Sequence, residues 1–334
     1  MSKIRGLVLG WYNHQNAGDD RLATCITHWL HDHELVFMPH TTIPCRSLLD
    51  QFDYVLLGGG SIANNVGGVF RNMKSWIAPA NIPVFCAGIG VSDFPQFEQE
   101  LSSIKESGGH IWVRDEQSLI NSRQPAGSVD VAPDLSWLYP LTLPHCTRQG
   151  TAINLRPGGG PRVLNLEHWE KPLNIVQDSW PWSLCFGKDD DNQLLGQLFE
   201  NNTEKMFDPT GAARAKMVIA MRFHAVIFAI QTGTPFVAIT HTKKLQYLLH
   251  DLGYSYAEVP YDQPERLQET IETVQKQMTS EELASTTRQV SESLWKYANN
   301  FKDKIENAVD NNAKRNSLAF RIRRRARQTF TRWS

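Results

Sequence analysis

The feature that most constrains the fold is the alternation of short apolar runs with polar, amphipathic stretches along most of the chain. Apolar runs fall at 4–9, 54–57, 84–87 and 111–113 in the first half, and at 152–155, 217–220 and 236–239 in the second. Amphipathic stretches such as 20–30, 97–106 and 116–121 lie between them. Strands that feed helices in this way are typical of parallel, doubly wound sheets, so the sequence predicts an α/β protein.

The length of 334 residues predicts more than one domain. A single hydrophobic core stops growing at about 250–300 residues, so two compact domains are expected. The stretch 140–150, with two prolines and a glycine, is typical of a linker. We therefore expect an N-terminal α/β domain over 1–145, a C-terminal α/β domain over 146–310 and a tail over 311–334.

Composition narrows the class of protein. Hydrophobic residues make up 41% and charged residues 21% of the chain, as in soluble globular proteins. No apolar run has the length of a transmembrane helix, and the N-terminus has no cleavage site of a signal peptide, so we expect a cytoplasmic protein. The five cysteines form no CxxC pair, which argues against both a disulfide framework and a zinc site. We expect no metal.

A run of three glycines, Gly58, Gly59 and Gly60, directly follows the apolar run 54–57. Glycines at the end of a strand let a ligand approach the backbone amides, although a sharp turn explains them equally well. The run matches neither GxGxxG nor GxxxxGK[ST], so the sequence contains no dinucleotide or P-loop fingerprint.

Charged side chains follow several of the other predicted strands. Asp19 lies between the first strand and the first helix, where a helix cap and a ligand-binding carboxylate are equally good interpretations. Arg114 ends the strand 111–113; it either binds an anion or forms an ion pair with Asp115 or Asp134. Asp134 itself is either a site carboxylate or the partner of such an arginine.

Two more cations occupy similar positions. Arg156 follows the strand 152–155 and requires a partner, which is either a substrate or a protein carboxylate. Lys244 follows the strand 236–239, where it is either solvated or in contact with a phosphate.

The strongest motif is Met221-Arg222-Phe223-His224, between the strand 217–220 and an apolar helix that ends at Gly233. A helix N-terminus offers unpaired N–H groups and a positive dipole, so Arg222 there completes an anion site. His224 is surrounded by apolar residues in the sequence. A buried histidine with a structural role is therefore the alternative to a catalytic one.

Taken in this order, the motifs resemble the polysaccharide pyruvyl transferase family over roughly residues 7–250. The most specific piece is the segment from Met221 to Pro235. The resemblance implies two Rossmann-like domains similar to the GT-B glycosyltransferase fold, with the donor between them and the sugar entering from the N-terminal side. It also implies that phosphoenolpyruvate is the co-substrate and that the product is a pyruvate ketal on a sugar of a polysaccharide or lipid-linked oligosaccharide.

The chemistry of such a transfer assigns roles to the candidate residues. Phosphoenolpyruvate carries about three negative charges near neutral pH, which Arg222, Arg156 and Arg114 are suited to bind. Its methylene carbon must be protonated by a general acid, for which His224 is our candidate. The sugar hydroxyl needs a base, for which we choose Asp19, with Asp134 as a substitute. No step requires a further cofactor.

The tail is strongly basic, whereas the rest of the chain is acidic and the net charge of the whole chain is -1. Its last 21 positions include eight basic residues: Lys314, Arg315, Arg321, Arg323, Arg324, Arg325, Arg327 and Arg332. Aromatic and apolar residues between them favour an anionic membrane surface over nucleic acid as the partner, with solvated disorder as the alternative.

Two other functions compete with pyruvyl transfer. A nucleotide-sugar glycosyltransferase of the same build uses glycines and arginines to bind a diphosphate. A non-catalytic interaction protein needs none of the proposed chemistry.

Overall fold

The computed structural model describes residues 3–63, 67–125, 127–142, 145–157, 164–186, 190–199 and 208–330, with only the backbone of 315–330. The chain forms two compact units. Unit 1 comprises 1–10, 26–132 and 296–334, and unit 2 comprises 11–25 and 133–295. The units thus differ from the continuous segments 1–145 and 146–310 expected from sequence, because two segments pack away from their neighbours in the chain.

Unit 1 contains a six-stranded parallel sheet in the order β2-β1-β3-β4-β5-β6. Its strands are β1 (Arg5–Gly10), β2 (Glu34–Pro39), β3 (Tyr54–Ala63), β4 (Val84–Val91), β5 (Ile111–Val113) and β6 (Asp130–Val131). β3 and β4 are buried almost throughout, as strands covered on both faces must be.

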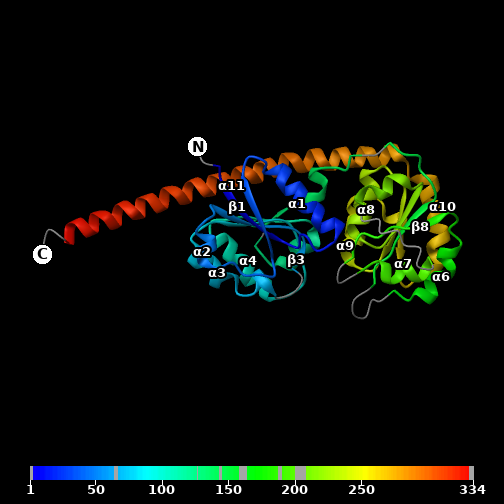
Figure 1. Ribbon diagram of the computed structural model, residues 1–334, viewed down its shortest axis with the longest axis horizontal. Coiled ribbons are helices and arrows are strands. Elements are labelled where there is room, and N and C mark those ends of the chain that lie inside the picture. The colour runs from blue at the N-terminus through cyan, green and yellow to red at the C-terminus, as the bar shows by residue number, and fades with distance from the viewer. Residues whose placement is uncertain are drawn as a thin grey trace. The chain divides into compact units, whose positions relative to one another are not determined.

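The helices of unit 1 follow its strands along the chain (Figure 1). They are α2 (Arg46–Leu49), α3 (Met73–Ala80), α4 (Gln96–Glu106) and α5 (Glu116–Ser122), with the 3-10 helix η1 (Gly68–Phe70). The long helix α11 (Ser280–Phe330) joins this unit from Lys296 onward.

The glycine run is part of a strand and not of a turn, which corrects the local structure expected for it. β3 continues through Gly58, Gly59 and Gly60 to Ala63 and pairs with β4, although the register shifts after Gly60. Gly59 and Gly60 have φ values of 68° and 76°, which glycine adopts without strain. The backbone irregularity that the glycines permit therefore lies inside the sheet.

Unit 2 contains a five-stranded parallel sheet in the order β11-β10-β9-β7-β8. Its strands are β7 (Thr151–Asn154), β8 (Ser179–Pro181), β9 (Met217–Ala220), β10 (Phe236–Thr240) and β11 (Glu258–Pro260). The strand order reverses between β7 and β9. In open α/β sheets, ligands bind outside the carboxyl ends of the strands at such a point.

The helices of unit 2 include the apolar helix that was predicted to end at Gly233. They are α6 (Leu166–Asn174), α7 (Asn192–Leu198), α8 (Phe223–Gln231), α9 (Lys243–Asp251) and α10 (Leu267–Gln277), with the first turns of α1 (Ala17–Trp29) and of α11. Short 3-10 helices complete the unit: η2 (Leu135–Leu138), η3 (Pro209–Arg214), η4 (Ser255–Ala257) and η5 (Pro264–Arg266). α8 is buried from Ala225 to Gln231, because it is apolar on every side.

Helix α11 is well packed where it joins unit 1. Phe301 is buried and contacts the rings of Trp29, Phe85 and Trp112. The indole N–H of Trp29 donates to the carbonyl of Ala298 at 3.0 Å. α10 and α11 together cover most of 265–309.

The backbone of α11 remains helical to Phe330, so it includes most of the basic tail. The side chains of Arg315, Arg321, Arg323, Arg324, Arg325 and Arg327, and all of Arg332, lie outside the described residues. Within the described part of the chain, no helix has both the length and the apolar character that crossing a bilayer requires.

Candidate active site

Four polar side chains come from the carboxyl edge of the unit 2 sheet, at the reversal of strand order. Asn154 ends β7, and Arg222 is the N-cap of α8, two residues after the end of β9. His224 is the second residue of α8, and Lys244 is the second residue of α9, which follows β10. This edge is where a parallel sheet is expected to bind a ligand.

His224 faces a carboxylate. Its Nε2 lies 3.6 Å from Oδ1 of Asp134, which also accepts a hydrogen bond from the backbone N–H of Ser136 at 3.0 Å. The side chain is 13% exposed, and among the described residues Nε2 has no hydrogen-bond partner. The ring therefore has an acidic neighbour, in contrast to the purely apolar setting that the sequence around it indicates.

The start of α1 lies against the other edge of the His224 ring. A Cβ atom at Gly18 would be 2.1 Å from Nδ1 of His224, so only glycine fits there. This close approach brings Asp19, the next residue, to the site. Because α1 begins in unit 2, Asp19, Asp134 and His224 all belong to the same unit.

The carboxylate of Asp19 has a raised pKa. Its Oδ2 accepts a hydrogen bond from Nδ2 of Asn16 at 2.6 Å. Burial raises the pKa of Asp19, and Asp134 adds to this, whereas His224, Lys244 and Arg222 oppose it. A carboxylate whose pKa is raised accepts a proton more readily, which suits a general base.

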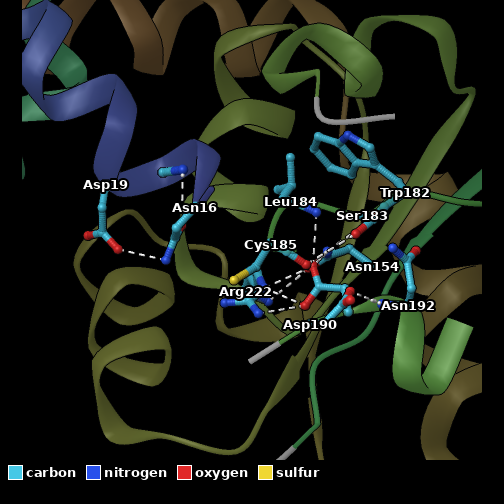
Figure 2. A network of polar contacts seen from close by, with 12 residues as sticks. Asn16, Asp19, Asn154, Trp182, Ser183, Leu184, Cys185, Asp190, Asn192 and Arg222 are labelled. Atoms are coloured by element: carbon cyan, nitrogen blue, oxygen red, sulfur yellow. Dashed lines mark hydrogen bonds and ion pairs between the residues drawn. The ribbon is translucent and has the colours of Figure 1, made fainter. Parts of the chain in front are cut away.

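Arg222 is held by a carboxylate that the sequence analysis did not identify. Its Nε lies 2.7 Å and 2.9 Å from the two oxygens of Asp191, and its Nη2 lies 2.6 Å from Oδ1. Asp191 is fully buried and Arg222 nearly so. Figure 2 shows Arg222 in this network with Asn154, Leu184 and Cys185. Arg222 was expected to meet a substrate anion; the structure gives it a protein partner.

Asp191 lies in the stretch 157–195, for which the sequence has no clear period. A buried arginine needs a partner, so the sequence requires an acid for Arg222 as it does for Arg156. Three consecutive aspartates at 189–191 were the available signal.

The remaining unit 2 candidates lie beside the same strand ends. Lys244 is 5.6 Å from the ring centroid of Phe223, within range of a cation–π interaction. Arg156 follows the end of β7 by two residues and is half-buried. The glycines at 158–160 lie outside the described residues.

Arg114 and the three glycines belong to unit 1, apart from the unit 2 candidates. Arg114 Nε is 3.0 Å from Oδ2 of Asp115, and its guanidinium lies on the backbone of Gly90. Asp115 in turn caps α5 by accepting from the N–H of Ser118 at 2.7 Å. Of the alternatives weighed for Arg114, the structure therefore shows the ion pair with Asp115.

One cluster among the described side chains has the spacing of metal ligands: Asp32, His33 and Glu306 in unit 1. The ammonium group of Lys302 lies 2.6 Å from Asp32 and 3.6 Å from Glu306. Because the ammonium group of Lys302 already pairs with both carboxylates, the cluster is an ion-pair network.

Comparison with solved structures shows the fold. The glycotransferase of kitacinnamycin is 11% identical with a TM-score of 0.50, and the alignment covers 91% of this chain and 100% of that one. A putative UDP-N-acetylglucosamine 2-epimerase from Listeria monocytogenes is 8% identical with a TM-score of 0.50, covering 86% and 91%. These similarities, together with the two parallel sheets, confirm the predicted fold of two Rossmann-like α/β domains similar to the GT-B glycosyltransferases.

Comparison with sequences gives a more local result. No curated protein has a significantly similar sequence. The sequence model of the family described as polysaccharide pyruvyl transferase matches residues 212–243, which include Arg222 and His224. The resemblance to polysaccharide pyruvyl transferases predicted from the sequence is thus confirmed over the segment that forms β9, α8 and β10.

Proposed function

We propose that the protein is a transferase that moves the enolpyruvyl group of phosphoenolpyruvate onto a sugar and forms a pyruvate ketal. The observation that carries the proposal is the convergence of His224 with Asp134 and Asp19 at the strand reversal of unit 2. An imidazole that lies beside one carboxylate and interacts electrostatically with a second, whose pKa is raised, supplies the acid and the base that this transfer needs. His224 also lies inside the segment that matches the family.

The donor requires cations and amide donors. Phosphoenolpyruvate carries about three negative charges near neutral pH. In unit 2, Lys244, Arg156 and the N-terminus of α8 supply positive charge, and Arg222 adds hydrogen-bond donors although Asp191 offsets its charge. For unit 1 taken by itself, we propose Arg114 and the backbone at Gly58, Gly59 and Gly60 as substrate contacts.

The reaction follows from these groups. His224 gives a proton to the methylene carbon of phosphoenolpyruvate, and the adjacent carbon becomes electrophilic. A sugar hydroxyl attacks that carbon and gives its proton to Asp19. The C–O bond to phosphate then breaks, a second sugar hydroxyl closes the ketal, and the departing phosphate takes the proton of that hydroxyl. The proton held by Asp19 returns to His224, which restores both groups. Asp134, whose Oδ1 lies 3.6 Å from Nε2 of His224, orients the ring. No further cofactor enters these steps.

A thermal-shift screen tests the donor before any acceptor is known. Phosphoenolpyruvate should raise the midpoint of unfolding, whereas UDP-sugars should not, because only a ligand that binds the folded state shifts it. The second step is release of phosphate in the presence of a panel of sugars, with the acceptor gaining the mass of a pyruvate ketal.

The same screen decides between the competing functions. A shift with UDP-sugars alone indicates a nucleotide-sugar glycosyltransferase. If neither class of ligand shifts the midpoint, and His224→Gln leaves every measured interaction intact, a non-catalytic interaction protein is the better description.

We further propose that the acceptor is a polysaccharide or lipid-linked sugar and that the protein works at the cytoplasmic face of a membrane. The basic residues from Lys314 onward support this proposal, because clusters of lysine and arginine bind anionic lipid surfaces.

A further inference from the structure

The buried pair of Arg222 and Asp191 is part of a longer chain of contacts. Besides Arg222, Asp191 Oδ2 accepts hydrogen bonds from Nδ2 of Asn154 at 3.1 Å and from the backbone N–H of Leu184 at 2.9 Å. The backbone N–H of Arg222 donates to Oδ1 of Asn154 at 3.2 Å. One carboxylate therefore joins the end of β7, the loop after β8 and the start of α8.

The loop after β8 continues the chain to α1. The carbonyl of Leu184 accepts a hydrogen bond from the N–H of Ala17 at 2.9 Å, and Asn16 pairs with Cys185 as an antiparallel bridge. Asn16 also donates to Asp19 at 2.6 Å. Figure 2 shows the hydrogen bond between Asn16 and Asp19 at the start of α1. Two hydrogen bonds, joined by the backbone of Leu184, therefore connect Asp191 to the first turn of α1, which carries Asp19.

We infer that Asp191 is a positioning residue that fixes Arg222 and, through Leu184, the segment of α1 that carries Asp19. This inference rests on the proposed function, because it concerns the geometry of the proposed acid and base. It assigns Asp191 no contact with substrate. Because Asp191 neutralises Arg222, we assign Lys244 and Arg156 to balance the negative charge of phosphoenolpyruvate.

Because Asp191→Asn removes a negative charge, it should affect the affinity for phosphoenolpyruvate and the rate of transfer differently. Removing one negative charge leaves the pocket one unit more positive, so an anionic donor binds at least as tightly as before. The fixed geometry is lost, and misplacement of a catalytic group by about 1 Å costs on the order of a hundredfold in rate. A mutation that only unfolds part of the protein would lower the amount of active enzyme and would not separate affinity from rate in this way.

The test compares wild type, Asp191→Asn and the matched control Asp190→Asn. Asp190 is the adjacent residue, and its carboxylate accepts from the N–H of Asn192 at 2.9 Å. Three quantities are measured: the affinity for phosphoenolpyruvate by calorimetry, the rate of phosphate release with a sugar that supports turnover, and hydrogen exchange at the amide of Ala17.

For Asp191→Asn we expect unchanged or tighter binding of phosphoenolpyruvate, phosphate release slower by about a hundredfold, and exchange at Ala17 faster by about tenfold or more. The amides of β10 should keep their protection, and Asp190→Asn should behave as wild type. Wild-type rate and wild-type exchange at Ala17 in Asp191→Asn would overturn the inference.

If Asp191→Asn does not fold, the double variant Asp191→Leu/Arg222→Met replaces it, because it leaves neither charge buried alone. The same faster exchange at Ala17 is expected, and wild-type protection there contradicts the inference. The exchange measurement needs no substrate. If wild type neither binds phosphoenolpyruvate nor releases phosphate, the proposed function is wrong, while exchange at Ala17 still decides whether Asp191 positions α1.

Discussion

At the scale of single residues, the proposal depends on the ring of His224. We expect His224→Gln to lower the rate of phosphate release by about a hundredfold to ten-thousandfold, the usual contribution of a general acid. Stability should change little, because glutamine can still reach the carboxylate of Asp134. Steady-state kinetics and the midpoint of thermal unfolding check the two parts.

The control for this prediction is His250→Gln on α9, where the side chain is largely exposed. This variant should retain the wild-type rate. Near-wild-type turnover in His224→Gln would remove His224 from the mechanism.

Asp19 connects catalysis with stability through its pKa. Burial raises this pKa above 3.8, so the folded state holds the proton more tightly than the unfolded state. The ionised form therefore lowers stability as pH rises through the raised pKa. We expect Asp19→Asn to unfold at a higher temperature than wild type at pH 7, with the difference vanishing near pH 3, and to release phosphate at least about a hundredfold more slowly.

Thermal unfolding of both proteins across this pH range is the measurement. Asp208→Asn serves as the control, since Asp208 caps η3 in the same unit. An Asp19→Asn variant that is less stable than wild type at pH 7 would show that the hydrogen bond from Asn16 outweighs the burial of charge.

At the scale of elements, the approach of α1 to α8 depends on the missing side chain of Gly18. An added Cβ at 2.1 Å from Nδ1 of His224 must displace either the ring or the helix. Overpacking of this kind costs about 1–3 kcal/mol. We expect Gly18→Ala to lower the free energy of unfolding by about that amount and to slow phosphate release.

Gly67→Ala is the matched control, because a Cβ there meets nothing within 4 Å. Chemical denaturation gives both values. Equal free energies of unfolding in the two variants would show that α1 moves away from His224 without loss of stability.

Helix α11 is tied to unit 1 by Asp130. The Oδ2 atom of Asp130 accepts from His110, Tyr297 and Lys304, each at 2.8 Å. Burial raises the pKa of Asp130, but the hydrogen bonds from Lys304, His110 and Tyr297 outweigh it and lower the pKa to about 2. A depressed pKa stabilises the fold above pH 4, and the gain is lost as pH falls toward 2.

We therefore expect Asp130→Asn to be less stable than wild type at pH 7, by about 1 kcal/mol after allowance for solvent screening. The difference should shrink below pH 3. Denaturation at both pH values tests this expectation, and Asp303→Asn, on an exposed face of α11, is the control. A difference that does not depend on pH would exclude the ion pairs as its cause.

The sequence predicts the helices and strands of this protein better than the contacts between their side chains. The alternation of apolar runs predicted parallel sheets in both units, because buried strands and amphipathic helices leave a periodic signal. It also placed Arg222 and His224 at the start of α8. It did not predict that β3 continues through Gly58, since a glycine run is compatible with both a turn and an irregular strand.

The contacts of the site were harder to predict than the elements. Asp134 next to His224 and Asp191 next to Arg222 join residues that are 90 and 31 positions apart. Local patterns contain no information about such pairs, because the tertiary packing of unit 2 creates them. For the same reason, chain order did not reveal that 11–25 belongs with 133–295.

At the scale of the whole molecule, the proposed membrane association depends on the basic tail. Each lysine or arginine near an anionic surface contributes about 1 kcal/mol to binding, and eight such residues lie between Lys314 and Arg332. Truncation after Ala313 removes all eight and keeps Asn312, whose side chain donates to the carbonyl of Asn81 at 2.8 Å. We expect wild type to sediment with phosphatidylserine vesicles at low salt and to be released by high salt. The truncated protein should stay in the supernatant and keep the wild-type unfolding midpoint. Equal sedimentation of the two proteins would exclude the tail as a membrane anchor, and loss of binding together with a lower midpoint would show that the tail acts through stability.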